Sequence, residues 1–358
     1  MKKDSIDVIF TGLIRTPDWF KKSLEYMLKF RKKKLISKII FSTWDYELAK
    51  YPGLKEFLLK NKIIIIENKE PEDRGRGNIF CQMKSLEVGL KKVNKNKFVL
   101  KTRCDLFINP DFLEDLIVAK EEKLRITYHL PKKDLFKYKV WVPYFEITAP
   151  FHIADECFFG YYNDISKLVN YEHYDDDYKI KGGAAHVQRY MPVFISDYPI
   201  LENYLINHSN VGFSADTKTY RFFKKMTSNS QFLTNLFNKF MVNIRFMTLK
   251  KRFKEEGYMK ALAAYYFILY SHFYIDNSGI DNDFNNNDIF NRNIKPKKLV
   301  GDKKLINNYS KYYIFVPSKG HIYSLNNKFL KLIFEGKLED HKFSNKLLNE
   351  ISGFGLKS

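Results

Sequence analysis

The chain has few cysteines and no long hydrophobic run. Its 358 residues include only three cysteines, and these are widely spaced. This spacing gives no disulfide framework and no zinc site, and it indicates a reducing compartment. No segment approaches the roughly 20 consecutive apolar residues that a membrane-spanning helix requires. The N-terminal residues pass directly into a short strand pattern without a signal-peptide core. We therefore expect a cytoplasmic protein.

Several motifs that identify a function are also missing. The first strand is not followed by G-x-G-x-x-G, which disfavours a dehydrogenase-type dinucleotide site. There is no helix-turn-helix, zinc-finger or RNP signature and no internal repeat. Positive charge is abundant instead: 61 Lys and Arg against 41 Asp and Glu give a formal net charge of +20. With 24 Tyr and 32 Phe, this composition favours an anionic partner such as a nucleotide, a nucleic acid or an acidic lipid surface.

The first 119 residues alternate strand and helix patterns. Strands are expected at 7–14, 38–42, 63–67 and 97–105, and helices at about 16–33, 46–60, 78–92 and 112–119. This alternation predicts an α/β, Rossmann-like fold with a mostly parallel sheet flanked by helices. The four consecutive isoleucines at 63–66 predict a strand that is buried on both faces. Two short strands, at 125–130 and 139–142, and a helix from 165 are expected to follow.

The composition changes at about residue 216. We expect a catalytic domain over 1–215 and a basic, aromatic-rich and mainly helical C-terminal extension over 216–358. Within the extension, an apolar helix is predicted over 260–274, a linker rich in Asn and Asp over 277–293 and a strand over 312–316. The lysines and aromatic residues of 217–274 are read as a membrane-facing region, or alternatively as the core of a helical subdomain.

The stretch Lys97–Asp105 is the leading candidate for a site. Alternate residues of a strand share a face, so Lys101, Arg103 and Asp105 are expected together at the carboxyl end of a central strand. Ligands of open α/β sheets bind at that edge. Two cations suit a diphosphate, and one carboxylate suits a metal ion or a sugar hydroxyl. The alternative is a strand that runs out into a solvated charged turn.

Other candidates follow neighbouring strands. Gly12 ends the first strand, where a glycine lets the backbone approach a ligand or simply forms a turn. Trp44 and Asp45 follow the second strand, where they either stack on a base and bind a ribose or serve as a core Trp beside a capping Asp. The loop at 74–77 alternates Arg and Gly, a pattern that wraps a phosphate or is merely solvated.

Two acids, Asp155 and Glu156, lie among aromatic residues. An apolar environment raises the pKa of a carboxyl group, which suits a general base. We expect Asp155 rather than Glu156 to take this role, because only one of two consecutive residues in an extended segment faces a cleft. The alternative is an acidic turn before a buried strand.

Four stretches in order resemble the WavE-type glycosyltransferases of bacterial lipopolysaccharide and capsule synthesis. They are Phe41–Trp44, Gly77–Ile79 with Gln82 and Ser85, Val99–Leu106, and Pro150–His152 with Asp155 and Phe158–Gly160. The resemblance covers about residues 5–200, and in the segment 186–190 only Gln188 matches the family pattern. It implies a GT-A-like fold and transfer of a sugar from a nucleotide-sugar donor to a growing glycan.

The resemblance also implies roles for single residues. The donor contacts are Gly12, Thr43, Trp44, Asn78, Gln82, Lys101 and Arg103. Asp105 and Asp155 are the catalytic residues, with Asp155 as the base on the acceptor hydroxyl. GT-A enzymes usually carry Asp-x-Asp at the end of a central strand, where it binds Mg²⁺ or Mn²⁺ and the donor diphosphate. Here Arg103 replaces the first Asp and adds a cation that neutralises diphosphate directly, so that a divalent ion is either weakly bound or unnecessary. Asp105 is left to bind the metal ion, or alternatively the ribose or the sugar of the donor.

The implied partners are a nucleotide-sugar donor and a lipid-linked glycan acceptor. These place the enzyme on the inner face of the cytoplasmic membrane as a peripheral protein, with no nucleic-acid partner. Two alternatives from the composition remain open, namely a basic nucleic-acid-binding protein and a membrane-surface protein without catalysis.

Overall fold

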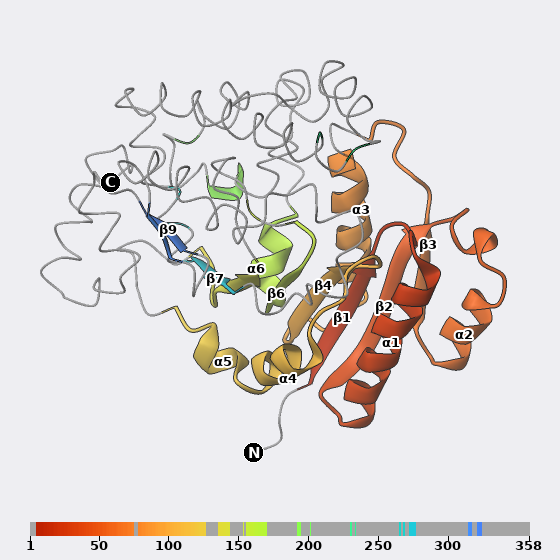
Figure 1. The fold of residues 1–358 in the computed structure, drawn as a ribbon, viewed down its shortest axis with the longest axis horizontal. Helices are drawn as coiled ribbons and strands as arrows, with labels where there is room; N and C mark the ends of the chain where they lie inside the picture. Colours follow the sequence, from red (N-terminus) through yellow and green to blue (C-terminus); the bar gives the residue numbers. More distant parts are fainter. Residues whose placement is uncertain are drawn as a thin grey trace, which may run out of the picture.

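A central sheet organises the described part of the chain. The computed structural model describes residues 5–74, 78–126, 135–143, 153, 155–169, 192–194, 272–276, 314–316 and 321–323, with single residues 201, 230, 233, 265 and 268. The seven strands of the sheet are β1 (Ile6–Thr11), β2 (Ile36–Trp44), β3 (Ile64–Asn68), β4 (Phe98–Arg103), β5 (Val140–Val142), β6 (Phe158–Tyr161) and β7 (Phe273–Ile275). Their lateral order is β3-β2-β1-β4-β6-β5-β7, and Figure 1 shows the sheet extending from β3 on the right to β7 on the left.

Most of the strands run parallel. β1 pairs in parallel with β2 and with β4, and β2 pairs in parallel with β3. β6 lies antiparallel between β4 and β5, and β7 is parallel to β5. The predicted mostly parallel α/β sheet is therefore confirmed. The central strand expected over 97–105 is β4, but it ends at Arg103, so Asp105 lies in the turn after the strand and not on the strand itself.

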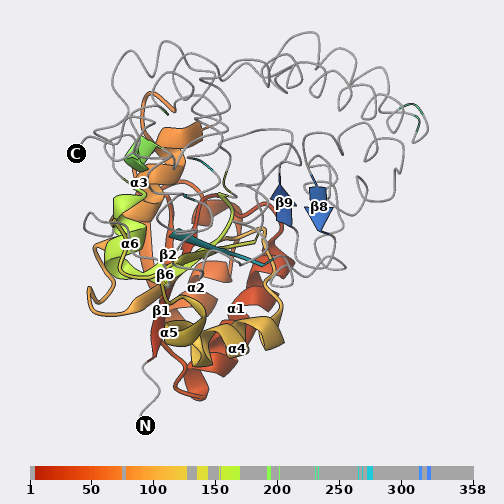
Figure 2. The same cartoon turned by 90° about the vertical axis from the view of Figure 1, so that its left-hand side faces the viewer.

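Helices cover both faces of the sheet. They are α1 (Pro17–Lys32), α2 (Leu54–Lys60), α3 (Ile79–Leu90), α4 (Pro110–Val118), α5 (Lys120–Lys123) and α6 (Tyr162–Lys167), with short 3₁₀ helices at Leu48–Lys50 and Pro192–Phe194. The apolar sides of α1, α2 and α4 share one core with Val8, Phe10 and Phe41 of the strands. α3 packs on the opposite face, over Ile9. Figure 2 shows α3 and α6 on one side of the strands and α1 and α4 on the other.

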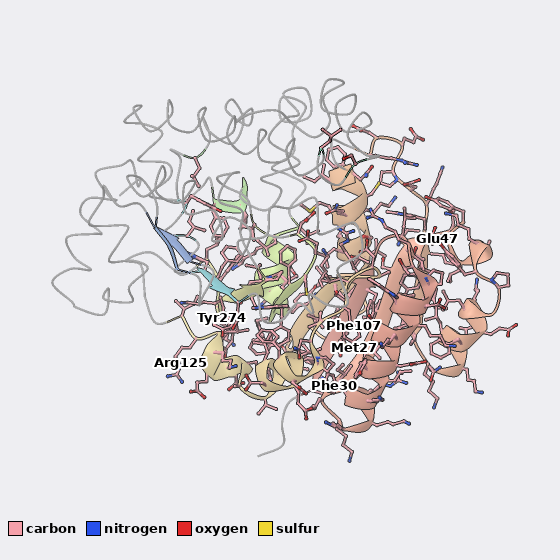
Figure 3. The ribbon with its side chains drawn as sticks, in the orientation of Figure 1. Met27, Phe30, Glu47, Phe107, Arg125 and Tyr274 are labelled. Atoms are coloured by element: carbon pink, nitrogen blue, oxygen red, sulfur yellow. The ribbon has the colours of Figure 1, made fainter. Side chains whose placement is uncertain are left out.

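Local sequence signals explain where these helices begin. Asn109 caps α4: its side-chain oxygen accepts hydrogen bonds from the backbone N–H groups of Asp111 and Phe112, at 3.0 and 3.2 Å. Pro110 then occupies the first turn, where its missing N–H costs nothing. α1 also has a proline, Pro17, in its first turn, but the side chain of Thr16 before it makes no capping hydrogen bond. The buried residues of α1 include Met27 and Phe30, which are labelled in Figure 3.

Two predictions for the segment 46–67 are wrong. The helix expected over 46–60 is interrupted at Gly53, whose φ of 79° is left-handed, so a 3₁₀ turn and the short α2 replace it. The strand with four isoleucines is not buried on both faces. β3 is the edge strand of the sheet, and Ile64–Ile66 are only half-buried. An isoleucine run shows that a strand packs well, but it does not determine the strand's lateral position.

Part of the chain beyond residue 215 contributes to the same sheet. The helix predicted over 260–274 ends early, because Phe273–Ile275 form β7 and pair with β5. The strand predicted at 312–316 is confirmed as β8 (Ile314–Val316), which pairs antiparallel with β9 (His321–Tyr323). Nearly all of the predicted helical extension, including 217–229 and 241–260, lies outside the described residues. None of the helices described is both long and apolar enough to cross a bilayer.

Candidate functional site

An open pocket lies where the strand order changes direction. On one side of β1 lie β2 and β3, and on the other lies β4, so the switch point of the sheet falls between β1 and β4. Parallel α/β sheets bind ligands at the carboxyl edge of such a point. Seven of the predicted site residues line the pocket there: Gly12, Trp44, Asn78, Gln82, Lys101, Arg103 and Asp105. Segments distant in sequence thus meet at the predicted edge.

The turn after β1 forms one wall of the pocket. Gly12 has a φ of 92°, which favours glycine, and its N–H donates to the carbonyl of Ser42 at 3.1 Å. The Thr43 hydroxyl donates to the Gly12 carbonyl at 3.0 Å. Thr43 itself is fully buried and does not line the pocket. Its link to the site is therefore through the position of Gly12.

The loop from β1 to α1 is fixed at Ile14 by hydrogen bonds to its N–H and to its carbonyl. Glu47 is buried, and its carboxylate accepts the N–H of Ile14 at 2.6 Å. The Tyr51 hydroxyl donates to the Ile14 carbonyl at 2.5 Å. The next residue, Arg15, lines the pocket. These two hydrogen bonds fix the backbone that carries Arg15.

Lys101 is a buried cation in the wall of the pocket. It is 2% exposed. Its ammonium group donates to the backbone carbonyls of Asp155 and of Glu156, the latter at 3.3 Å, and lies 5.1 Å from the centre of the Phe158 ring. Desolvation makes a buried charge costly unless such groups surround it. Lys101 therefore ties the segment containing Asp155 to the end of β4.

Asp105 lies between two arginines. The Arg103 side chain donates two parallel hydrogen bonds to it, from Nε to Oδ1 at 2.7 Å and from Nη2 to Oδ2 at 2.5 Å. Nη1 of Arg15 lies 3.2 Å from the same Oδ2. Burial alone raises the pKa of Asp105, but the charge and hydrogen bonds of Arg103 and the charge of Arg15 outweigh it. The pKa of Asp105 is lowered as a result, and the carboxylate is ionised at neutral pH.

A second carboxylate in the pocket lining, Glu70, holds several neighbouring side chains. It accepts hydrogen bonds from the Tyr46 hydroxyl at 3.1 Å and from Arg74 at 2.8 Å. The Cys81 thiol donates to its other oxygen at 3.7 Å. Burial and the neighbouring Glu70 charge raise the pKa of Cys81 to about 11, so the thiol stays protonated at neutral pH.

The N-terminal turns of α3 supply polar groups to the pocket. Asn78 precedes the helix with a φ of 58°, a left-handed conformation that Asn tolerates better than most residues. Gln82 and Ser85 follow at spacings of four and three residues, which places them on the same side of a helix. All three line the pocket. Trp44 lines it too but is 2% exposed, so it forms a wall whose ring is largely covered.

The charges around the pocket favour an anion. The cationic lining residues are Arg15, Arg74, Lys101 and Arg103, and the anionic ones are Glu70 and Asp105. Among the described lining residues, positive charge therefore exceeds negative charge by two. The diphosphate of a nucleotide-sugar is a diester with two negative charges, and guanidinium groups bind such oxygens in pairs.

These residues do not fit a divalent metal ion. Mg²⁺ and Mn²⁺ prefer several oxygen ligands, with carboxylates that are not already engaged. Both oxygens of Asp105 accept hydrogen bonds from Arg103, and Arg15 adds a second positive charge beside them. In the part of the chain that the structure describes, no group of three or more His, Cys, Asp and Glu side chains is placed to hold a metal.

The pocket also contains residues that the sequence analysis did not select. Arg15, Glu70 and Cys81 line it. Arg15 lies in the short loop between β1 and α1, where no helix or strand pattern indicates which way a side chain points. Cys81 is detectable in principle, because it follows Asn78 by three residues on a helix. The predicted base Asp155 is not among the lining residues. It is half-buried, and its carbonyl oxygen accepts a hydrogen bond from Lys101.

No protein-family model matches the chain, and no curated protein or solved structure shows significant similarity to it. The function is therefore inferred from the fold and from the chemistry of the pocket.

Proposed function

We propose that the chain is a GT-A-like glycosyltransferase that moves a sugar from a nucleotide-sugar donor to a growing bacterial surface glycan. The observation that carries the proposal is the position of the pocket. It lies at the carboxyl edge of β1 and β4, at the switch point, and its lining has an excess of two positive charges. A nucleotide-sugar needs this combination, because its diphosphate must be neutralised as it becomes the leaving group.

The proposed donor site divides into two parts. The nucleoside lies along Gly12, Trp44 and Asn78, where the backbone turns away from β1 and α3 begins. The diphosphate lies toward Lys101 and Arg103, at the end of β4. The positively charged groups stabilise the charge that develops on the diphosphate when the bond to the sugar breaks.

Asp155 is proposed as the base in an inverting reaction. The acceptor oxygen attacks the anomeric carbon while its proton passes to the Asp155 carboxylate, and the nucleoside diphosphate leaves with the bonding electrons. The bond from Lys101 to the Asp155 carbonyl supports this role, since it ties the residue to the wall of the pocket. Asp155→Ala should lower transfer at least 100-fold and leave nucleoside diphosphate affinity nearly unchanged. A larger loss from Glu156→Ala would assign the role to Glu156.

A thermal-shift screen separates this proposal from nucleic-acid binding. A ligand that binds only the folded state raises the melting temperature, by an amount that grows with the logarithm of its concentration divided by its dissociation constant. Nucleoside diphosphates should stabilise the protein, and single-stranded or double-stranded oligonucleotides of equal phosphate concentration should not. Stabilisation by oligonucleotides alone would favour the nucleic-acid-binding alternative.

The acceptor is proposed to be lipid-linked, with the enzyme peripheral on the inner face of the cytoplasmic membrane. The support is compositional, because Lys224, Lys225, Lys250, Lys251 and Arg252 lie outside the described residues. Each such cation contributes on the order of 1 kcal/mol to binding near an anionic surface. Binding to anionic liposomes should weaken as salt rises and when the five cations become Gln. Equal binding to neutral liposomes, or none to either, would contradict this location.

A further inference from the structure

The role of Asp105 in the pocket differs from that of a metal ligand. The carboxylate has a side chain that is only 5% exposed, and it is held by a parallel pair of hydrogen bonds from Arg103. A parallel pair of this kind fixes the plane of the guanidinium group as well as its position. The Arg103 side chain is 22% exposed, so the group oriented in this way still reaches the pocket surface.

The same carboxylate also holds Arg15. This side chain is 52% exposed, and its Nη1 lies 3.2 Å from Asp105. An exposed arginine loses side-chain entropy when it is fixed, so an existing partner lowers the cost of ordering it on a ligand. The backbone before Arg15 is also fixed, because Glu47 and Tyr51 form hydrogen bonds with the N–H and the carbonyl of Ile14.

We propose that Arg15 and Arg103 form a two-arginine clamp that binds the donor diphosphate without a divalent ion, and that Asp105 is the positioning residue of this clamp. The inference rests on the proposed function for the identity of the donor, but it concerns diphosphate binding in general. The guanidinium group of Arg103 carries its N–H donors in a fixed fork, and the two hydrogen bonds to Asp105 set the plane in which that fork lies.

The positive charge around Asp105 suits a diphosphate better than a divalent metal ion. A divalent ion placed at Asp105 would lie beside two guanidinium groups and would need oxygens that already accept hydrogen bonds. A diphosphate that contacts the two guanidinium groups meets positive charge that Asp105 already orients, and Lys101 adds a third cation to the lining. The position that the resemblance assigns to metal binding is thus built to orient cations.

Titration calorimetry of the full chain with inorganic pyrophosphate and with ADP, CDP, GDP and UDP tests the clamp. For the tightest of these ligands, the dissociation constant in EDTA should lie within about threefold of its value in Mg²⁺. Arg15→Ala and Arg103→Ala should each raise it about tenfold or more, and Arg103→Lys should raise it less than Arg103→Ala. Arg125→Ala is the matched control, since Arg125 is an exposed arginine that does not line the pocket. Figure 3 shows it on the other side of the structure from Glu47, which fixes the loop that carries Arg15.

A double-mutant cycle tests the positioning role of Asp105. Asp105→Asn should raise the dissociation constant about tenfold in the wild-type background, because the arginines lose their orientation. In a protein that carries both Arg15→Ala and Arg103→Ala, Asp105→Asn should change the dissociation constant less than twofold. A residue that acts only through the two arginines then has nothing left to orient. Tighter binding by Asp105→Asn, or an equal effect in both backgrounds, would overturn the positioning role.

The outcomes also separate the clamp from the proposed function. Binding that needs Mg²⁺ or Mn²⁺, is lost in EDTA and loses this dependence in Asp105→Asn would overturn the clamp and leave the transferase intact. Metal-independent diphosphate binding without turnover of any nucleotide-sugar would support the clamp and contradict the transferase. Absence of diphosphate binding with and without metal would overturn both.

Discussion

At the scale of single residues, Thr43 influences the pocket without lining it. Its buried hydroxyl donates to the carbonyl of Gly12, at the turn where the chain leaves β1. Loss of this hydrogen bond costs on the order of 1 kcal/mol of stability. The contribution of Thr43 to ligand binding is therefore expected to depend on its hydroxyl group and not on its size.

Thr43→Val should destabilise the protein by about 1 kcal/mol and weaken nucleoside diphosphate binding several-fold. Thr43→Ser keeps the hydroxyl and should retain most of both properties. Chemical denaturation and calorimetry on the two variants measure these effects. Normal binding by a destabilised Thr43→Val protein would show that the position of Gly12 does not affect the ligand.

Two other buried residues control how stability depends on pH, with opposite signs. Burial raises the pKa of Asp164 to about 6, although it accepts hydrogen bonds from the N–H groups of Lys137 and Tyr138. Burial lowers the pKa of His272 to about 3, and its ring packs on Phe136 and Phe194. The folded state thus holds a proton on Asp164 more tightly than the unfolded chain does, and holds one on His272 less tightly.

The two contributions oppose each other between about pH 4 and 6. Asp164 favours folding at low pH, and this stability is lost as the pH rises through about 6. His272 favours folding above pH 6.5, and this stability is lost as the pH falls toward about 3.

Substituting one of the two residues should reveal how the other makes stability depend on pH. In His272→Phe, stability should fall by a few kcal/mol as the pH rises from about 4 to 6, and in Asp164→Asn it should rise by a similar amount over the same interval. Urea denaturation across this range measures both. Identical pH slopes for the wild type and the two variants would contradict these assignments.

At the scale of secondary-structure elements, the position of α3 decides whether Asn78, Gln82 and Ser85 reach the pocket. The helix lies close to β1 at Gly89, where an added Cβ would stand 2.6 Å from Cγ2 of Ile9. Ile9 is fully buried, and its Cγ2 is attached to a β-branched carbon that has little freedom to move. The close approach of helix and strand therefore requires glycine at residue 89.

Gly89→Ala should destabilise the protein by about 1–3 kcal/mol, although alanine is the better helix former. It should also weaken nucleoside diphosphate binding, because the whole helix must shift. Gly53→Ala provides a comparison, since an added Cβ there meets nothing within 4 Å and only the positive φ opposes it. A neutral or stabilising Gly89→Ala variant would show that the helix has room to move.

Much of this element structure was predictable from the sequence. Proline and asparagine mark the starts of α1 and α4, and apolar runs mark the strands. The lateral order was not predictable: β3 lies at the edge and β6 runs antiparallel, and both depend on pairings between distant segments. The same holds for the candidate site: its local features were predictable from the sequence, and its long-range contacts were not. The end of β4 could be identified, whereas the pairing of Arg15 with Asp105 joins residues 90 positions apart and leaves no local signal.

At the scale of the whole molecule, the sheet includes a strand from beyond residue 215. β7 pairs with β5, and the indole N–H of Trp141 in β5 donates to the Asp276 carbonyl at 3.0 Å. β5 is buried along its full length. A chain that ends at residue 215 would expose this strand as an apolar edge, which favours aggregation.

A chain of residues 1–215 should therefore be less soluble and melt at a lower temperature than the full chain. Light scattering and differential scanning calorimetry on the two proteins measure the difference. The matched comparison is Trp141→Phe in the full chain, which removes the indole donor but keeps β7. It should cost about 1–3 kcal/mol, because it loses a hydrogen bond and leaves a smaller ring in the core. Equal solubility and melting temperature of the short chain would show that residues 1–215 fold without β7.

The central claim is that the pocket between β1 and β4 binds a nucleotide-sugar and activates it for transfer. The most direct measurement is release of nucleoside diphosphate from a panel of nucleotide-sugars by the wild type, Arg103→Ala and Arg125→Ala. We predict that the wild type and Arg125→Ala consume the same donor at similar rates, and that Arg103→Ala is slower by about 100-fold or more. Consumption of no donor by the wild type, or equal rates for Arg103→Ala and the wild type, would contradict the claim.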